Sequence, residues 1–288
     1  MIVGGAFIAW AAFLAVVALT VAIGASPELK TLAAWCLAAA ATLIALAFAY
    51  WTYALATLAY IVEDQRLVIR WGFRQFVIPI DNIQRMVPGR TLDVAHVRGL
   101  NWWGCHVGVA DVGRIGRTAF FSTHSTPAEL LYVVTAGGAY ALTVTDQAAF
   151  AEEIQSRAGL GPVRPSLQRS HVTGLGALPF WHDRVAIWAA ALSLVTLLVL
   201  VAYVFAQYPS LPEVVQISYP DFGGVVRIGD KSELLRIAYV GLGIGGVNLA
   251  LGIALHAYER ATGLWLMASG GMLQLVLLGA AIAAFERA

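Results

Sequence analysis

Residues 130–154 read LLYVVTAGGAYALTVTDQAAFAEEI, and this stretch carries the signals of a small β-sheet domain. Runs rich in β-branched and aromatic residues occupy 130–135 and 139–143, and the two glycines between them are typical of a tight hairpin loop. Thr145 or Asp146 can then cap a helix in which apolar residues recur at the fourth position. The stretch predicts two paired strands followed by one amphipathic helix.

Further strands are predicted upstream, where apolar side chains recur at every second position. Residues 58–62, 67–71 and 74–78 are separated by short polar or glycine turns, which indicates a meander, and 117–123 reads as one more strand. Several strands followed by one helix favour a small β-barrel that the helix plugs at one end.

The composition of the whole chain is that of a membrane protein. Hydrophobic residues fill 59% of the 288 positions and charged residues only 12%, whereas a soluble domain carries about 25% charged residues. The formal net charge of +1 provides no basic field, which excludes nucleic acid as a partner. Cys36 and Cys105 are too few for a disulfide framework, and the histidine spacings match no zinc pattern. No metal ligand and no cofactor is predicted.

Charge-free runs locate the membrane spans, because a helix needs about 20 apolar residues to cross a bilayer. The second run is 32 residues long, and we end its span near Tyr53, since the aromatic residues there are typical of the membrane interface. The first run lacks the basic start of a signal peptide and is interpreted as a retained span. The runs are 1–27, 31–62, 185–212, 237–258 and 261–285.

Basic residues predict which side of the membrane each loop occupies. Five spans place 63–184 and the turn at Arg260 on one side, with 13 basic residues together, and Lys30, 209–236 and the C-terminal tail on the other, with 5. The bias favours a cytoplasmic location for the large segment. The residues near span ends that carry it are Arg66, Arg70, Arg169, Arg184 and Arg260, against Lys30, Arg227, Lys231, Arg236 and Arg287.

Polar residues inside the spans are few. No Asp, Glu, Lys or Arg lies in any span, which argues against ion-coupled transport. Asn248 and Gln274 are each 13 residues from the turn centre at residue 261, so we expect them to face each other at one depth. They either form a hydrogen bond between two helices or line a polar ligand site. Gly241 and Gly245 form a GxxxG pattern that permits close helix packing.

The segment 97–117 is the predicted contact surface of the β-rich domain. Tryptophan prefers the membrane interface, and basic residues near anionic lipid add about 1 kcal/mol each. The alternative is that one tryptophan belongs to the core and the arginines are ordinary solvated residues. The candidate residues for lipid or partner binding are Arg98, Trp102, Trp103, Arg114 and Arg117.

Three pieces of the chain resemble bacterial pleckstrin-homology-like (PH-like) domains fused to membrane helices: YIVEDQRLVIRWGFRQFVIPIDNIQRM (60–86), NWWGCHVGVADVGRIGRTAFFSTHS (101–125) and the stretch 130–154. The resemblance implies a β-barrel capped by a C-terminal helix, with ligands, peptides or partner proteins bound at loops. Residues 208–234, YPSLPEVVQISYPDFGGVVRIGDKSEL, resemble a loop of the membrane protein family DUF1648, although Ser218 or Tyr219 stands where that family usually has His.

The predicted fold class is an α+β membrane protein with five transmembrane helices and a cytoplasmic PH-like barrel. Its predicted parts are a two-helix hairpin (1–53), the PH-like domain (54–160), a Pro/Gly linker (161–183) and a three-helix region (184–288) with an extracytoplasmic loop (209–236).

The predicted function is that of a non-enzymatic adaptor or accessory subunit in the bacterial inner membrane. It would present the PH-like domain to membrane lipids and to a protein partner, or to a second copy of the chain. The alternative is a protein of the immunity or export type that handles small molecules or peptides at a site between the spans. A hydrolytic enzyme is disfavoured, since no nucleophile and base, such as Ser269 and His256, stand in plausible register. No catalytic residue is predicted.

Overall fold

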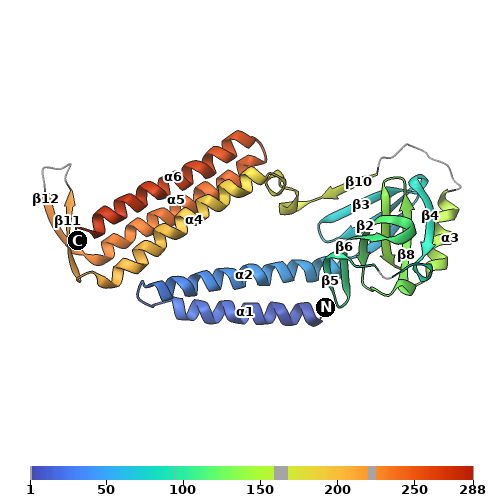
Figure 1. Cartoon of the computed structure of the whole chain (residues 1–288), viewed down its shortest axis with the longest axis horizontal. Coiled ribbons are helices and arrows are strands. Elements are labelled where there is room, and N and C mark those ends of the chain that lie inside the picture. The colour runs from blue at the N-terminus through green and yellow to red at the C-terminus, as the bar shows by residue number, and fades with distance from the viewer. Residues whose placement is uncertain (1, 94, 159–167, 220–224, 288) are drawn as a thin grey trace. The chain divides into compact units, whose positions relative to one another are not determined.

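The computed structural model describes residues 2–93, 95–158, 168–219 and 225–287, and it divides into two compact units (Figure 1). Unit 1 comprises Met1–Ala11 and Ile44–Gly176, and unit 2 comprises Ala12–Leu43 and Ala177–Ala288. Helices α1 (Ile2–Ala22) and α2 (Leu29–Ala56) therefore contribute to both units. Residues 161–167 of the predicted linker and 220–224 of the predicted loop lie outside the described residues.

Unit 1 contains two β-sheets and the helix α3 (Gln147–Ala158). The first sheet has the order β1-β2-β3-β10, with antiparallel pairs throughout. The second has the order β4-β8-β9-β7-β6-β5, in which β7 and β9 pair in parallel. The strands are β1 (Ala59–Glu63), β2 (Arg66–Trp71), β3 (Arg74–Pro79), β4 (Ile83–Pro88), β5 (Arg98–Trp102), β6 (Cys105–Val112), β7 (Gly116–Ser122), β8 (Leu130–Thr135), β9 (Gly138–Thr143) and β10 (Arg169–Val172).

The main core of unit 1 lies between the two sheets and α3. Ile69 of the first sheet, Val133 and Leu142 of the second, and Ile154 of α3 are at most 2% exposed. Tyr60 joins the sheets through its hydroxyl, which donates to the carbonyl of Phe121 (2.5 Å). Burial of these side chains supplies the apolar stabilisation that the sheets need.

The predicted closed barrel is wrong, because the two sheets remain separate ladders among the described residues. Pro79 ends β3, and the 3-10 helix η1 (Ile80–Asn82) then leads the chain away into the second sheet. Proline has no N–H to donate, and a backbone bond from the N–H of Ile80 to the carbonyl of Gln65 (3.0 Å) follows it before the chain turns away.

In the described part of unit 1, four strands lie where no strand was expected: β4, β5, β6 and β10, the last inside the predicted linker. Glycines interrupt the alternation of apolar residues in the β5–β6 region. Gly108 is required there by packing, because a Cβ on it would lie 2.3 Å from the carbonyl oxygen of Arg98 on the paired strand. The β5–β6 hairpin is recognised by the close approach of its two backbones. A pattern of hydrophobic residues gives no information about that approach.

Unit 2 contains three long helices and a two-stranded ribbon in addition to its parts of α1 and α2. The helices are α4 (Arg184–Gln207), α5 (Leu235–His256) and α6 (Arg260–Phe285), and the ribbon pairs β11 (Val214–Tyr219) with β12 (Val225–Asp230). Among the described residues, five helical segments are long and apolar enough to cross a membrane, and each contains most of one predicted run: Ile2–Ala22, Leu29–Ala56, Arg184–Ser210, Lys231–His256 and Arg260–Phe285.

Glycines bring the helices of unit 2 into close contact. A Cβ on Gly241 would lie 2.6 Å from Leu200 of α4 and 3.0 Å from Gln274 of α6, and Gly245 faces Gln274 and Leu197 in the same way. The amide nitrogen of Gln274 donates to the carbonyl of Gly241 (2.9 Å), while its oxygen is buried without a hydrogen-bond partner. These contacts hold α4, α5 and α6 at small separations.

The expected pairing of Asn248 with Gln274 is wrong. Asn248 lies opposite Gly270, about one helical turn from Gln274, because a Cβ on Gly270 would meet the Asn248 side chain at 3.2 Å. The expectation assumed a turn centred on residue 261, whereas α6 already begins at Arg260. The glycines, rather than the two amides, set the register of this helical hairpin.

Asp183 connects the segment before α4 to the turn between α5 and α6. Its carboxylate caps α4 by accepting from the N–H groups of Val185 (3.0 Å) and Ala186 (3.4 Å). It also accepts from the guanidinium of Arg260 (2.5 Å) and lies 3.5 Å from the buried His256 ring. The hydrogen bond from Arg260 lowers the pKa of Asp183 to about 2, and the capped N–H groups act in the same direction.

The Asp183→Asn variant tests this contact through its pH dependence. Asparagine retains a capping oxygen but loses the charge that pairs with Arg260. Because the pKa is lower in the folded protein, the carboxylate stabilises the fold above about pH 4, and this contribution is lost as the pH falls toward 2. We expect the wild type in detergent to melt above the variant at neutral pH and the difference to shrink below pH 4. An unchanged difference in acid would contradict this assignment.

Candidate functional site

The candidate site lies where α2 leads into the first sheet. Only Thr57 and Leu58 separate the end of α2 at Ala56 from the start of β1. The hydroxyl of Thr57 donates to the carbonyl of Tyr53 (2.9 Å) and accepts from the N–H of Gly72 (3.1 Å) in the β2–β3 turn. The link between α2 and β1 is short, and Thr57 bonds it both to α2 and to the β2–β3 turn. The end of α2 is therefore continuous with the first sheet.

Gly72 makes the close contact between the β2–β3 turn and α2 possible. Its φ is +56°, and a Cβ on it would lie 2.9 Å from the Cβ of Ala54. The next residue, Phe73, contacts the rings of Tyr50 and Tyr53, both with centroids 5.5 Å away. The aromatic residues near the end of α2 thus pack partly on the domain, although the sequence predicts only that they face the membrane interface.

Replacing Gly72 by alanine should weaken this contact. A left-handed backbone costs a side chain roughly 1–2 kcal/mol, and the clash with Ala54 adds to that cost. Gly104 is the matched control, because its φ is +76° but no atom lies within 4 Å of a Cβ there. We expect Gly72→Ala to lower the melting temperature more than Gly104→Ala does. Equal decreases in melting temperature would show that backbone strain, and not the clash with Ala54, destabilises the Gly72→Ala variant.

Trp102, at the end of β5, packs against α1 and α2. Its ring centroid lies 5.1 Å from Phe48, 5.9 Å from Trp51 and 6.1 Å from Phe7. Phe7 and Phe48 also stack on each other at 4.9 Å. We call Phe7, Phe48, Trp51 and Trp102 the aromatic junction, and aromatic pairs of this kind contribute about 0.5–1.5 kcal/mol each beyond their buried area.

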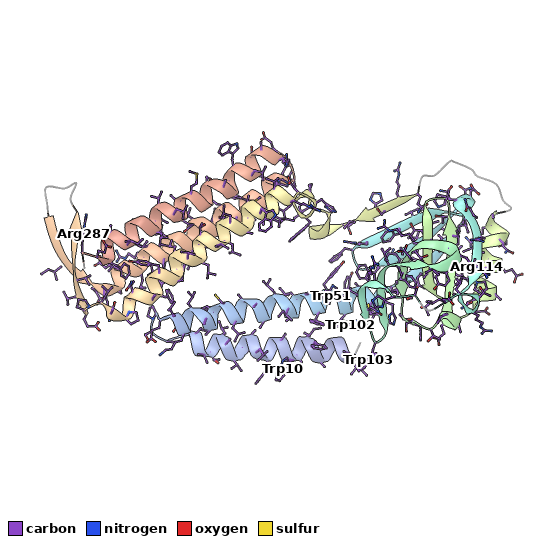
Figure 2. All side chains as sticks on the ribbon, viewed as in Figure 1. Trp10, Trp51, Trp102, Trp103, Arg114 and Arg287 are labelled. Atoms are coloured by element: carbon purple, nitrogen blue, oxygen red, sulfur yellow. The ribbon has the colours of Figure 1, made fainter. Side chains whose placement is uncertain are left out.

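Trp103 occupies the β5–β6 turn beside the aromatic junction, and its side chain is 86% exposed. The φ of +76° at Gly104 matches the third position of a type II turn, where glycine is favoured. Figure 2 shows both tryptophans next to the ends of α1 and α2. Adjacent tryptophans therefore have different surroundings: Trp102 packs on the two helices and Trp103 faces outward.

The three candidate arginines lie elsewhere on the domain. Arg114 and Arg117 are at the β6–β7 turn, and β6 separates that turn from Trp103 by about 24 Å. Arg98 pairs with Val109, toward the same far end. Figure 2 shows Arg114 on the part of the domain remote from Trp102 and Trp103. The five candidates are thus split into two separate groups.

A groove of about 1000 Å³ opens beside α3, and the sequence contains no pattern that predicts it. Met86 of β4 and Leu131 of β8 line it together with Ala148 and Ala151 of α3. Charged and polar groups at its margin include Arg90, His124, Glu129 and Asp146. We call it the sheet–helix groove. About half of its lining residues are polar or charged, so the groove offers both apolar and polar contacts to a partner.

Cys105 and His106 follow the β5–β6 turn and belong to the interior. Burial raises the pKa of the Cys105 thiol and lowers the pKa of His106. His106 Nδ1 lies 2.6 Å from the side-chain oxygen of Asn101, which fixes the orientation of the ring. In the described part of the chain, no three His, Cys, Asp or Glu side chains gather into a possible metal site.

The comparisons with known proteins identify a related family only for the β-rich domain of unit 1. Residues 58–158 match the family model of a bacterial PH domain. The match begins one residue before β1 and ends at the last residue of α3, so it covers both sheets except β10. No curated protein and no solved structure matches the chain. The resemblance of 208–234 to DUF1648 gains no support from the family match and remains a prediction.

Proposed function

We propose that this chain is a non-enzymatic integral membrane adaptor or accessory subunit of the bacterial inner membrane. It presents its PH-like domain at the cytoplasmic face, where the domain binds a protein partner and touches lipid. The observation that carries the proposal is the aromatic junction, since it attaches a PH-like domain directly to two helices apolar enough to span a membrane.

Exposed apolar side chains support the membrane location. The candidate spans carry strongly exposed apolar side chains, among them Leu192, Val276 and Leu43, each at least 64% exposed. Apolar surface of this kind is stable in the hydrocarbon of a bilayer. Trp188, Tyr258 and Trp265 are at least 74% exposed near the same end of the α4–α6 bundle, as expected of residues at the interface.

The length of α2 supports contact between Trp103 and lipid. Its 28 residues extend about 42 Å, which exceeds the roughly 30 Å of the bilayer core, so about eight residues extend beyond it. Phe48 lies eight residues before the end of α2 at Ala56, and we propose that α2 extends beyond the core at this end, with the aromatic junction at the membrane boundary. Trp103 then enters the headgroup region, while the arginines remain away from the membrane.

The sheet–helix groove is the proposed site for the protein partner. We would purify the tagged full-length chain from its own membranes in mild detergent and identify retained proteins and lipids by mass spectrometry. Ala148→Arg places a long charged side chain in the groove, and Ala149→Arg makes the same change one residue outside it. Both residues are exposed in the first turn of α3, so their effects on folding should be equal.

We expect a partner to be retained by the wild type and Ala149→Arg and lost from Ala148→Arg. Equal retention by all three proteins would exclude binding through the groove. Recovery of a small molecule in place of a protein would favour the alternative function, which is a site between the spans.

A further inference from the structure

Unit 2 contains an apolar groove bounded by α2, α4 and α5. Leu32 and Cys36 of α2, the α4 face from Leu194 to Phe205, and Tyr239 of α5 line it, and its volume is about 570 Å³. No charged side chain is among its lining residues. The groove therefore suits an apolar occupant.

A second apolar groove lies on the other side of α2. Ala15 and Leu19 of α1 line it together with Ala38 and Thr42 of α2, and its volume is about 390 Å³. Trp35 and Ala39 line both grooves. One short strip of α2 thus separates two neighbouring apolar grooves.

The larger groove extends about 17 Å along the α4 face from Leu194 to Phe205. An extended acyl chain is the apolar occupant that a membrane supplies to such a face.

Two cations stand at the end of the larger groove where α2 and α5 begin. Lys30 is two residues from Leu32, and Arg236 is three residues from Tyr239. Their side chains are 77% and 74% exposed, and each also pairs with a nearby glutamate. Exposed cations at this end favour a headgroup that carries a phosphate and a net negative charge.

We propose that unit 2 binds one anionic phospholipid with two acyl chains, one in each groove on either side of Trp35 and Ala39, and with its headgroup near Lys30 and Arg236. The proposal rests on the membrane insertion in the proposed function. It adds a lipid site that is separate from the PH-like domain.

The test uses the full-length chain in vesicles of phosphatidylethanolamine and phosphatidylglycerol. A small fraction of the phosphatidylglycerol carries a photoreactive diazirine on one acyl chain, and mass spectrometry maps its cross-links. Ala39→Phe fills both grooves, whereas Ala40→Phe makes the same change at the adjacent exposed position, which lines neither groove. A carbonate wash of the same vesicles reports whether the chain is inserted at all.

We expect cross-links within 32–42 in the wild type and in Ala40→Phe, and about tenfold fewer in Ala39→Phe. The Lys30→Gln/Arg236→Gln double variant should lose the preference for phosphatidylglycerol over an equivalent phosphatidylcholine probe. Equal cross-linking in Ala39→Phe and Ala40→Phe, or an unchanged preference in the double variant, would overturn the proposal. A chain removed by the carbonate wash would overturn both this inference and the proposed function, whereas an inserted chain without these cross-links would overturn this inference alone.

Discussion

Replacing Trp102 by alanine is expected to detach the PH-like domain from the ends of α1 and α2. The change removes the ring that contacts Phe7, Phe48 and Trp51, and it leaves a gap beside the buried Cys105. Truncation of a large aromatic residue in a core costs about 3–5 kcal/mol, and for the half-buried Trp102 we expect about 2–4 kcal/mol. For a chain of this length the melting temperature should fall by roughly 5–10 °C.

Trp103 supplies the matched control for this experiment. Its side chain is 86% exposed, so Trp103→Ala should leave the melting temperature in detergent almost unchanged. Protease cleavage within 57–58 should become faster in Trp102→Ala than in the wild type or Trp103→Ala. Equal melting temperatures and cleavage rates for the two variants would show that the aromatic junction does not fix the domain.

A leucine at Gly263 is expected to separate α5 from α6. A Cβ at this position would lie 2.7 Å from the carbonyl oxygen of Gly252 and 2.8 Å from the Cα of His256. Both are backbone atoms, so no side-chain rotation relieves the clash. Overpacking costs typically 1–3 kcal/mol, and we expect about 3 kcal/mol or more here because the whole helix must move.

Gly279 provides the control on the same helix. Nothing lies within 4 Å of a Cβ there, so Gly279→Leu should have little effect on thermal unfolding in detergent. Gly263→Leu should also lower the yield of folded protein. Similar yields and melting temperatures for both variants would exclude the close α5–α6 contact.

The sequence predicts those elements whose signals are local. The Gly137–Gly138 hairpin and α3 are confirmed, and Asp146 caps α3 by accepting from the N–H groups of Ala148 and Ala149, both at 3.0 Å. The register of α5 against α6 could not be predicted in this way. It depends on which glycines meet, and the spacing of Asn248 and Gln274 contains no information about that contact.

The candidate site could be predicted only in part. Trp102 and Trp103 stand out as a pair, but adjacent residues in a sequence give no indication that one packs on helices and the other faces outward. Phe7 and Phe48 lie within long apolar runs, where nothing distinguishes them from residues that would face lipid. The aromatic junction arises from contacts between distant segments, which no local pattern records.

The first sheet has a mechanical consequence. Its outer strands are β1, which follows α2, and β10, which precedes α4. A force that pulls the end of α2 away from the start of β10 therefore loads the strand pairs that join β1, β2, β3 and β10. The four-residue β10 has the fewest such bonds, so it should be the first strand to yield under tension.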